Sequence, residues 1–193
     1  DSACSLPPYN LEERLIEEIY KMVKSIALGI KAIGLINVQL ALYENTLYLL
    51  EVNPRASRTI PFVSKCIGNS LAQIGAKCMS GISLEKQGFT KEIIPEYFSV
   101  KEAILPFEKF QGVDPILGPE MKSTGEVMGI GKSFAEAYAK AQLGAGKKIS
   151  SEGCVFLSVR NSDQVFVAEL AKEFHELGFK IVATKGTAGF ISK

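Results

Sequence analysis

The alternation of apolar and polar positions first predicts a long amphipathic helix near the start of the chain. Between residues 10 and 34, apolar residues recur every three or four positions, which places them on one face of an α-helix. Asn10 is the expected N-cap, and Glu13 follows it at the spacing of a capping box. Gly34 is the expected end. The apolar face consists of Leu11, Leu15, Ile19, Met22, Ile26 and Ile30.

Two apolar runs, residues 35–43 and 46–53, then predict a β-hairpin. With a loop of three residues, Gln39 lies directly opposite Glu51, and directly opposed residues share a face of the sheet. Asn53 stands two positions after Glu51, so its side chain shares that face. A two-residue loop would turn Gln39 to the other face, so this grouping depends on the register.

The end of the hairpin carries chemistry that an ordinary buried strand does not need. Gln39, Glu51 and Asn53 offer amide and carboxylate oxygens, which Mg²⁺ accepts together with phosphate oxygens. Arg55 and Arg58 follow, and guanidinium groups bind phosphate or carboxylate in a forked geometry. Such groups together offset the charge that builds up in phosphoryl transfer. A solvated strand end with a salt bridge is an alternative that the pattern alone supports equally.

The rest of the pattern divides the chain into two domains. A stretch rich in Gly, Ser and Lys, residues 144–153, predicts a linker. After it, strand, helix and strand patterns follow as in a βαβ unit, which implies parallel strands in an α/β domain. The helix patterns are residues 70–81, 132–146 and 163–178, and strand patterns lie within 95–107, 123–131, 154–160 and 179–184.

The glycine-rich run GEVMGIGKS is similar to the end of a phosphate-binding P-loop. Glu126 stands where that motif requires its first glycine, so we interpret the run differently. Gly129 and Gly131 are expected at a strand-to-helix turn, and Ser133 is expected to cap the helix that follows.

A second polar turn, ATKGTAGF at residues 183–190, follows a strand and precedes a predicted helix. Thr184, Gly186 and Thr187 can offer hydroxyl and backbone N–H groups to a phosphate there. Residues 158–160 end the preceding parallel strand, at the same carboxyl edge. A plain polar turn is the favoured alternative.

Composition and charge narrow the class of protein. The 193 residues are 47% apolar and 22% charged, as in globular proteins with a core. A formal net charge of +1 without a basic block argues against nucleic acid as the main partner. The apolar runs are far shorter than the ~18 residues of a membrane span, and no signal peptide is recognisable.

The cysteines predict a reducing environment. Cys4, Cys66, Cys78 and Cys154 lie far apart without a C-x-x-C pair, so we expect free buried thiols of a cytosolic protein. The single histidine, His175, has no cysteine close to it in sequence, which disfavours zinc. It is expected to lie on a helix surface.

Several motifs taken together resemble the large chain of carbamoyl phosphate synthetases, which are ATP-grasp enzymes. The most specific is EVNPRASRTIPFVSK, and the resemblance extends along the whole chain through DSACSLPP, VKEAILPF, GVDPILGPEMKSTGEVMGIG and FAEAYAKAQLGAG. It implies an α+β ATP-grasp C-terminal lobe, an antiparallel sheet with helices, over residues 1–146. Residues 147–193 resemble the start of a methylglyoxal-synthase-like regulatory domain, a truncated α/β parallel-sheet domain.

The resemblance implies roles for the residues at the end of the hairpin. Gln39, Glu51 and Asn53 match ligands of the Mg²⁺ or Mn²⁺ ions that bridge the ATP phosphates, with K⁺ as a further cofactor. Arg55 and Arg58 match residues at the reacting phosphate and carbamate. The implied reaction makes carbamoyl phosphate from bicarbonate, glutamine-derived ammonia and two ATP, for pyrimidine and arginine synthesis, with a glutaminase small subunit as partner.

The resemblance also implies effector sites. Asp1 and Glu102 match positions that help bind ornithine in bacterial enzymes. Thr184 and Thr187 match the site where uridylate inhibits and inosinate activates, and Lys185 stands where those relatives have histidine. Gln164 replaces a lysine that binds the effector phosphate in some relatives, so the identity of the effectors stays open.

The chain is expected to be a fragment of a cytoplasmic, oligomeric parent enzyme. It starts without Met, the HSG expected before Asp1 is absent, and it stops where a helix is expected. We expect the isolated fragment to be inactive, because it holds one wall of the ATP cleft. The alternatives are an effector- or partner-binding module without catalysis, and another ATP-grasp ligase.

Overall fold

The chain folds into two compact units, Asp1–Lys147 and Lys148–Lys193, each with its own sheet and core. The computed structural model describes residues 3–109, 112, 114, 116 and 121–192. Asp1, one of the predicted effector residues, lies outside the described residues.

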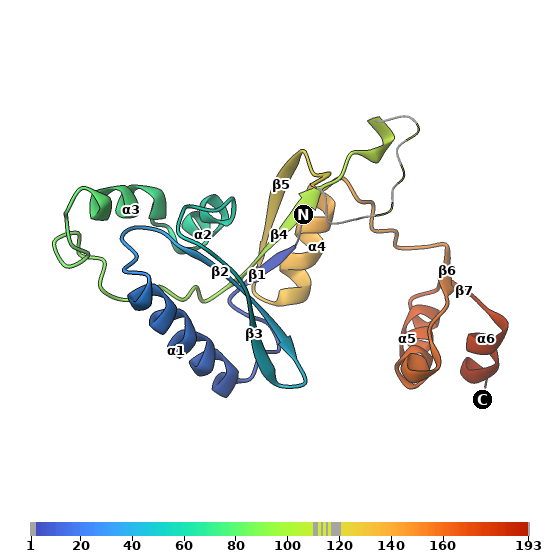
Figure 1. Ribbon diagram of the computed structural model, residues 1–193. Helices are drawn as coiled ribbons and strands as arrows, with labels where there is room; N and C mark the ends of the chain where they lie inside the picture. The colour runs from blue at the N-terminus through green and yellow to red at the C-terminus, as the bar shows by residue number, and fades with distance from the viewer. Residues whose placement is uncertain (1–2, 110–111, 113, 115, 117–120, 193) are drawn as a thin grey trace. The chain divides into compact units, whose positions relative to one another are not determined.

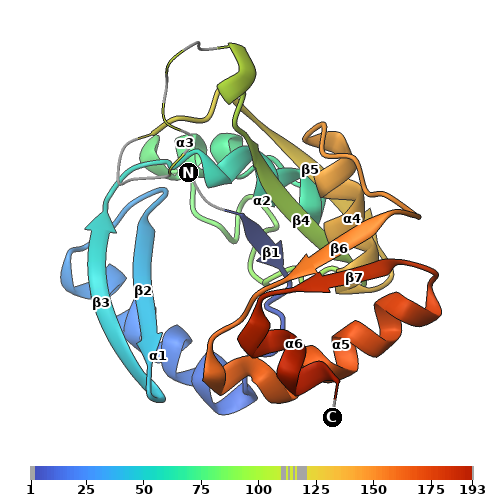
Figure 2. The same cartoon turned by 90° about the vertical axis from the view of Figure 1, so that its right-hand side faces the viewer.

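The first unit contains a three-stranded antiparallel sheet that a helix covers on one face. The elements are β1 (Cys4–Leu6), β4 (Phe98–Ile104), β5 (Gly125–Gly131) and the helix α4 (Phe134–Gly144). The strand order is β1-β4-β5, and α4 lies along β4 and β5 in both ribbon views (Figures 1 and 2). Val100, Ala137 and Ala141 form the buried core between sheet and helix.

The other elements of this unit are a β-hairpin and three helices. They are α1 (Glu13–Gly29), β2 (Asn37–Tyr43), β3 (Thr46–Asn53), α2 (Thr59–Ile67), α3 (Leu71–Met79) and a short 3₁₀ turn, η1 (Phe107–Lys109). Within the part of the chain that the structure describes, β2 and β3 pair only with each other. The sequence pattern does not predict β1, which has only three residues, or α2, which contains Pro61 in its first turn.

The predicted boundaries of α1 are wrong at both ends. Asn10 has a left-handed backbone, with φ of 53°, and the N-cap position is Glu12 without a side-chain cap. Asparagine tolerates that conformation, so Asn10 turns the chain before the helix rather than capping it. The helix ends at Gly29, well before Gly34, and only Leu15 of the predicted apolar face is fully buried.

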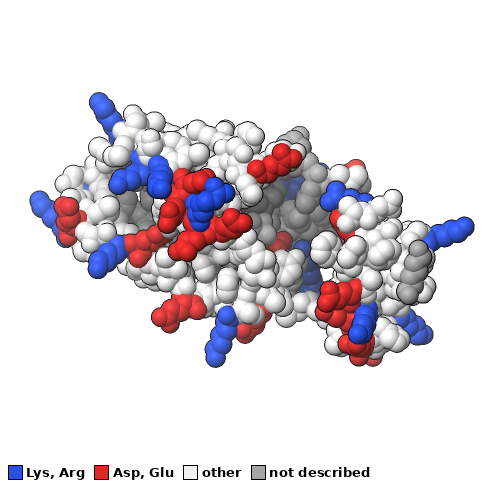
Figure 3. All heavy atoms as spheres, turned by 90° about the horizontal axis from the view of Figure 1, so that it is seen from below, with Lys and Arg blue, Asp and Glu red and all other residues white. Residues whose placement is uncertain are grey.

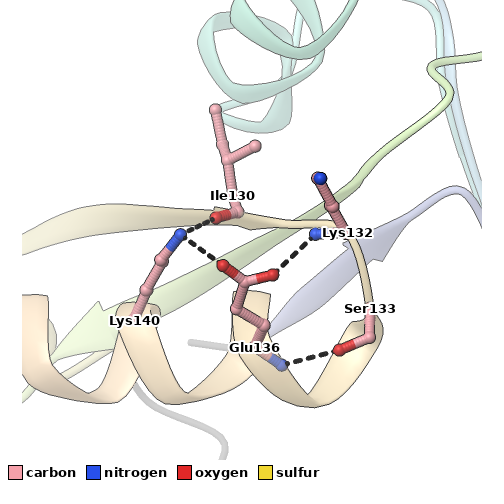
Figure 4. Close-up of polar contacts among 5 residues, drawn as sticks. All are labelled: Ile130, Lys132, Ser133, Glu136 and Lys140. Atoms are coloured by element: carbon pink, nitrogen blue, oxygen red, sulfur yellow. Dashed lines mark hydrogen bonds and ion pairs between the residues drawn. The ribbon is translucent and has the colours of Figure 1, made fainter.

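The start of α4 confirms Ser133 as its cap, but Gly129 and Gly131, which were predicted at the strand-to-helix turn, lie within β5. The Ser133 hydroxyl accepts from the Glu136 amide at 3.2 Å, and the Glu136 carboxylate accepts from the Lys132 amide at 2.8 Å. Lys140 donates to Glu136 and to the Ile130 carbonyl (Figure 4). The Lys140 and Lys132 hydrogen bonds hold the pKa of Glu136 below its usual range. These bonds use the amides that a P-loop would offer to phosphate.

The second unit is the predicted βαβ arrangement. Its elements are β6 (Cys154–Leu157), the 3₁₀ turn η2 (Asn161–Asp163), α5 (Gln164–Glu176), β7 (Lys180–Ala183) and α6 (Lys185–Ile191). β6 and β7 pair in parallel, as expected, and Leu157, Val167 and Ala171 form the core under them. Both helices lie on the same side of the two strands (Figure 2).

The cysteines are free, as predicted, but the expectation that all are buried is wrong. Cys66 is buried, and that burial raises the pKa of its thiol. Cys4 and Cys78 are half-buried, and Cys154 is exposed at the start of β6. Cys154 therefore lies on the solvent-exposed face of a short strand. The alternation of apolar and polar residues alone did not predict this exposure.

Charged side chains of both signs are interspersed over the face shown in Figure 3. On α1 they form pairs one helical turn apart, Arg14 with Glu18 at 3.1 Å and Lys21 with Glu17 at 4.0 Å. Such exposed pairs add little stability. None of the helices within the described residues is long and apolar enough to span a bilayer.

Candidate functional site

The hairpin that carries the predicted metal ligands turns on two residues, which corrects the predicted three-residue loop. Tyr43 pairs with Thr46 across Glu44 and Asn45. Both turn residues have positive φ, 47° and 60°, as a type I′ turn requires. Carried along the strands without interruption, this register would place Gln39 on the opposite face from Glu51.

A β-bulge at Leu50 prevents that outcome. Leu40 pairs with Leu49, and the next pair is Gln39 with Glu51, so Leu50 has no partner on β2. The side chains of Gln39 and Glu51 are therefore directly opposed and lie on one face. The predicted pairing is confirmed, although the turn and the bulge produce it together rather than the turn alone.

Asn37 is a further amide on this face, and the sequence reasoning missed it. It pairs directly with Asn53, one step beyond the Gln39 and Glu51 pair. The Asn53 amide nitrogen donates to the Glu51 carboxylate, which leaves the Asn53 side-chain oxygen available. The spacing could have revealed it, because Asn37 stands two residues before Gln39. Residues two apart on a strand share a face, which is the same reasoning that placed Asn53 beside Glu51.

Arg55 and Arg58 extend from the segment between β3 and α2. The Arg55 amide donates to the Asn53 carbonyl at 2.8 Å, and its side chain donates to the Ala56 carbonyl at 3.1 Å. Arg58 donates to the Met121 sulfur at 2.9 Å, a weak acceptor. Neither guanidinium forms an ion pair with any residue that the structure describes. Both therefore keep a positive charge that an anionic ligand can neutralise.

The start of α2 brings two hydroxyl groups to the same place. The Ser57 hydroxyl accepts from the Thr59 amide at 3.3 Å, and the Ser57 carbonyl accepts from the Ile60 amide at 3.2 Å. Ser57 thus holds the first turn of a helix whose assigned N-cap, Arg58, has no capping side chain. Thr59 is the first residue of the helix and is half-buried.

These groups surround one cavity of about 690 Å³. All the residues predicted for the hairpin end line it, and so do polar residues that were not predicted. The predicted ones are Gln39, Glu51, Asn53, Arg55 and Arg58, and the others include Asn37, Ser57, Thr59, Lys101 and Glu126. The structure therefore brings together residues from the hairpin, from the start of α2 and from the sheet of β4 and β5.

Lys101 and Glu126 add a charged pair to this cavity. Their side chains meet at 2.8 Å between β4 and β5, and Lys101 is only 5% exposed. Arg55, Arg58 and Lys101 bring three positive charges to the lining, and Glu51 and Glu126 bring two negative charges. The lining therefore has one positive charge in excess. The Lys101 side chain is buried and the Glu126 side chain is partly exposed, so this pair holds the Lys101 ammonium in place beside the cavity. The excess charge favours an anionic ligand.

The lining also offers oxygen atoms for a hard divalent cation. Within the described ranges, no group of three or more His, Cys, Asp or Glu side chains gathers to hold a metal. Glu51 contributes one carboxylate, and Gln39, Asn37 and Asn53 contribute amide oxygens. One carboxylate with amides is a weak set alone, but it fits an ion that also binds phosphate oxygens.

Glu102, predicted as an effector residue, lies within β4 with most of its side chain buried. Its side chain is only 13% exposed. It accepts from the Gln142 amide at 2.7 Å and lies 3.8 Å from the Lys147 ammonium. Glu102 and its neighbour Lys101 alternate along β4, so they point to opposite faces of the sheet. Glu102 therefore does not line the cavity around Arg55.

In the second unit, Thr184, Thr187 and Ser158 form a hydroxyl cluster at the carboxyl ends of β6 and β7. Thr184 donates to Thr187 at 3.2 Å and lies 3.4 Å from the Ser158 hydroxyl. Thr187 also accepts from the Val159 amide and is only 2% exposed. Thr184 and Lys185 are exposed. Thr184 can thus reach a ligand directly, whereas Thr187 holds the strand end.

Two domain families match the chain. Residues 1–87 match the family described as "Carbamoyl-phosphate synthase L chain, ATP binding domain", and residues 166–193 match the "MGS-like domain" family. The first match contains the hairpin and the start of α2, and the second contains most of α5, β7 and α6. The two matches lie in the two separate units of the structure.

The chain is also similar along its whole length to proteins named carbamoyl phosphate synthase large chain. Identity is 59% to the protein from Pseudomonas aeruginosa, over 99% of this chain. It is 55% to that from Neisseria meningitidis and 58% to that from Buchnera aphidicola, each over 100% of this chain. The chain spans 18% of the length of each of these relatives.

Proposed function

Because the chain belongs to the family of carbamoyl phosphate synthase large chains, we propose that its first unit forms part of the ATP site that phosphorylates carbamate. The observation that carries the proposal is the pairing of Gln39 with Glu51 on the face that also holds Asn53. Arg55 and Arg58, with no ion-pair partner among the described residues, line the same cavity. Oxygen ligands beside free guanidinium groups suit a metal-bound polyphosphate.

The proposed step transfers the γ-phosphoryl group of ATP to a carbamate oxygen. A bond forms between that oxygen and phosphorus, the bond from phosphorus to the bridging β,γ-oxygen breaks, and ADP leaves with the electron pair. No proton is transferred. Arg55 and Arg58 orient the two anions and offset the charge on the transferring group. The lining supplies positioning and charge without a covalent nucleophile.

Gln39, Glu51 and Asn53 would hold Mg²⁺ or Mn²⁺, with Asn37 beside them. A bound divalent ion would neutralise phosphate charge and hold the ATP phosphates in place. Of these residues, Gln39 and Glu51 would also contact the nucleotide. We include K⁺ as a further cofactor of the parent enzyme, although no described residue identifies its site.

For the parent protein we propose the full synthesis of carbamoyl phosphate in the cytoplasm, for pyrimidine and arginine formation. Its substrates would be bicarbonate, ATP and ammonia from a glutaminase small subunit, in an oligomeric enzyme. Residues 1–146 would form the C-terminal part of the second ATP-grasp domain, and residues 147–193 the start of the regulatory domain. Another ATP-grasp ligase is a weaker alternative, because it would not account for the MGS-like match.

The direct test is phosphoryl transfer from carbamoyl phosphate to ADP by the full-length protein with Mg²⁺. This reverse step needs only the proposed site, and we expect ATP to form. The isolated 193-residue chain should form none, because it would supply one wall of the ATP site and a site needs its surrounding shell. Absence of ATP with the full-length protein would refute the proposal, and ATP formation by the isolated chain would refute the second expectation.

The hydroxyl cluster of the second unit supports an additional role in binding a nucleotide monophosphate effector. Thr184 and Lys185 would contact the phosphate, and Thr187 would position Thr184 from its buried site. Uridylate and inosinate are the proposed ligands. Ornithine would bind near Glu102 and Asp1, and it would have to compete with Lys147 for the Glu102 carboxylate.

We expect Thr184→Ala in the full-length protein to weaken uridylate or inosinate binding by roughly tenfold, because a hydrogen bond to a charged phosphate is lost. Calorimetric titration with each nucleotide measures this. Ser151→Ala is a matched control, because it removes an exposed hydroxyl before the start of β6, at the end of the two parallel strands away from Thr184. Equal affinity in wild type and Thr184→Ala would count against this site.

A further inference from the structure

The start of α2 presents a hydroxyl group to the cavity that no described residue uses. Thr59 lines the cavity as the first residue of the helix. Its backbone amide donates to Ser57, but its own hydroxyl has no hydrogen-bond partner among the residues that the structure describes. The neighbouring Ser57 hydroxyl accepts that bond, which holds its oxygen at the helix start, whereas the Thr59 hydroxyl has its donor and both acceptor sites unused by the described residues and free for a ligand.

The cavity is chemically divided between two sides. The hairpin contributes Glu51 and its amide neighbours, which suit a cation with its phosphates. The start of α2 and the sheet contribute Arg58, Thr59 and the buried Lys101. These groups are hydrogen-bond donors, and two of them are positively charged. Glu126 pairs with Lys101 and offsets that charge, whereas the charge of Arg58 is not offset by a described residue. This second side therefore suits an anion without a metal, such as a small carboxylate.

We propose that the Thr59 hydroxyl donates a hydrogen bond to the carboxylate oxygen of the phosphoryl acceptor, and so is a substrate-binding residue. The inference rests on the proposed function and assigns the acceptor to the side of the cavity formed by α2. Among the described residues, Arg58 is bonded only to the weak Met121 acceptor, so it can turn to the same carboxylate. Thr59 then holds the non-reacting oxygen while the other oxygen attacks the γ-phosphorus.

The Thr59 side chain also lies at the positive end of the helix dipole. The first turn of α2 lacks one N–H group because it contains Pro61, and Ser57 satisfies the amides of Thr59 and Ile60. Backbone donors at this helix start are therefore largely used. Side-chain groups are the donors that remain, which explains why a side chain such as Thr59, rather than the backbone, would bind the acceptor.

The test compares Thr59→Val with Thr59→Ser in the full-length protein. The reaction is phosphoryl transfer from carbamoyl phosphate to ADP, with both substrates varied. Thr59→Val should lower kcat/KM for carbamoyl phosphate roughly 10- to 100-fold, as expected for one hydrogen bond to a charged group. The KM for ADP should change little. Thr59→Ser, which keeps the hydroxyl, should stay within about threefold of wild type.

Thr46→Val is the matched control, because it removes a threonine hydroxyl from the hairpin outside the cavity. It should leave all the constants unchanged. Unchanged kcat/KM in Thr59→Val would overturn the inference while leaving the proposed function intact. Equal losses in Thr59→Val and Thr59→Ser would also overturn it, because they would indicate a role of the threonine in the helix start. A wild-type protein without phosphoryl transfer would overturn both proposals.

Discussion

Replacing Glu51 with glutamine should lower the rate of phosphoryl transfer in the full-length protein roughly 100- to 1000-fold, the scale of losing one group that stabilises the transition state. Glu51 is the only carboxylate that the hairpin gives to the cavity among the described residues. Glutamine keeps the shape and can still accept from Asn53, so the hairpin should stay intact. What it removes is the negative charge that would bind the metal–phosphate complex.

The measurement is turnover at saturating ADP, carbamoyl phosphate and Mg²⁺, repeated over a range of Mg²⁺ concentrations. A metal ligand predicts a higher Mg²⁺ requirement as well as a lower rate. Glu44→Gln makes the same change at the exposed turn of the same hairpin and should leave both quantities unchanged. Wild-type turnover and Mg²⁺ dependence in Glu51→Gln would show that Glu51 is not a ligand.

Replacing Gly129 with alanine should loosen or unfold the packing of α4 on its sheet. A Cβ atom at this position would lie 2.1 Å from the Ala137 carbonyl oxygen and 2.5 Å from the Ala141 amide nitrogen. Both are backbone atoms of the helix, so no side chain can rotate to make room, and α4 must move away from β5. Ala137 and Ala141 are fully buried in that contact, so the core opens with it.

We expect a loss of about 3 kcal/mol or more in local stability, at the upper end of the range for overpacked cores. Hydrogen exchange of the α4 amides in the full-length protein measures it as roughly a 100-fold faster exchange, since about 1.4 kcal/mol corresponds to tenfold. A smaller yield of folded protein would also support the prediction, because it would indicate an even larger loss of stability.

Gly125→Ala provides the control on the same strand. Its Cβ would meet only the Ile104 side chain, at an ordinary 3.7 Å, and its backbone requires no positive φ. Its α4 amides should therefore exchange at the wild-type rate. Wild-type exchange in Gly129→Ala would mean that β5 and α4 are not in the close contact described.

The sequence by itself determined the βαβ order of the second unit, most of the strands of the first, and the capped start of α4. These features depend on local signals, because periodicity and a Ser-x-x-Glu cap act within a few residues. Ser133 and Glu136 illustrate this, since the Ser133 hydroxyl accepts from the Glu136 amide and the Glu136 carboxylate accepts from the Lys132 amide, all within one helical turn. The set of oxygen-bearing and arginine side chains at the hairpin end was also readable from the spacing.

Other local signals gave way to the surrounding structure. Asn10 has the right spacing from Glu13 for a capping box, yet it adopts a left-handed turn because the chain must enter α1 from β1. The sequence analysis did not predict the start of α2. The residue that holds the first turn of this helix is Ser57, and no strong sequence pattern surrounds it. The conformational preference of a single residue is a weak guide when that residue is compatible with two backbone conformations, such as a helix cap and a turn.

Only the tertiary structure decided how the site is assembled. A two-residue turn would have separated Gln39 from Glu51, and the unpaired Leu50 reverses that shift, which no count of loop residues reveals. Lys101 and Glu126 join the cavity from strands far away in sequence, and Glu102 points to the other face. The sequence thus fixes which chemical groups are present and their local alternation, whereas pairing between distant strands decides which groups meet, because register and packing are properties of the whole sheet.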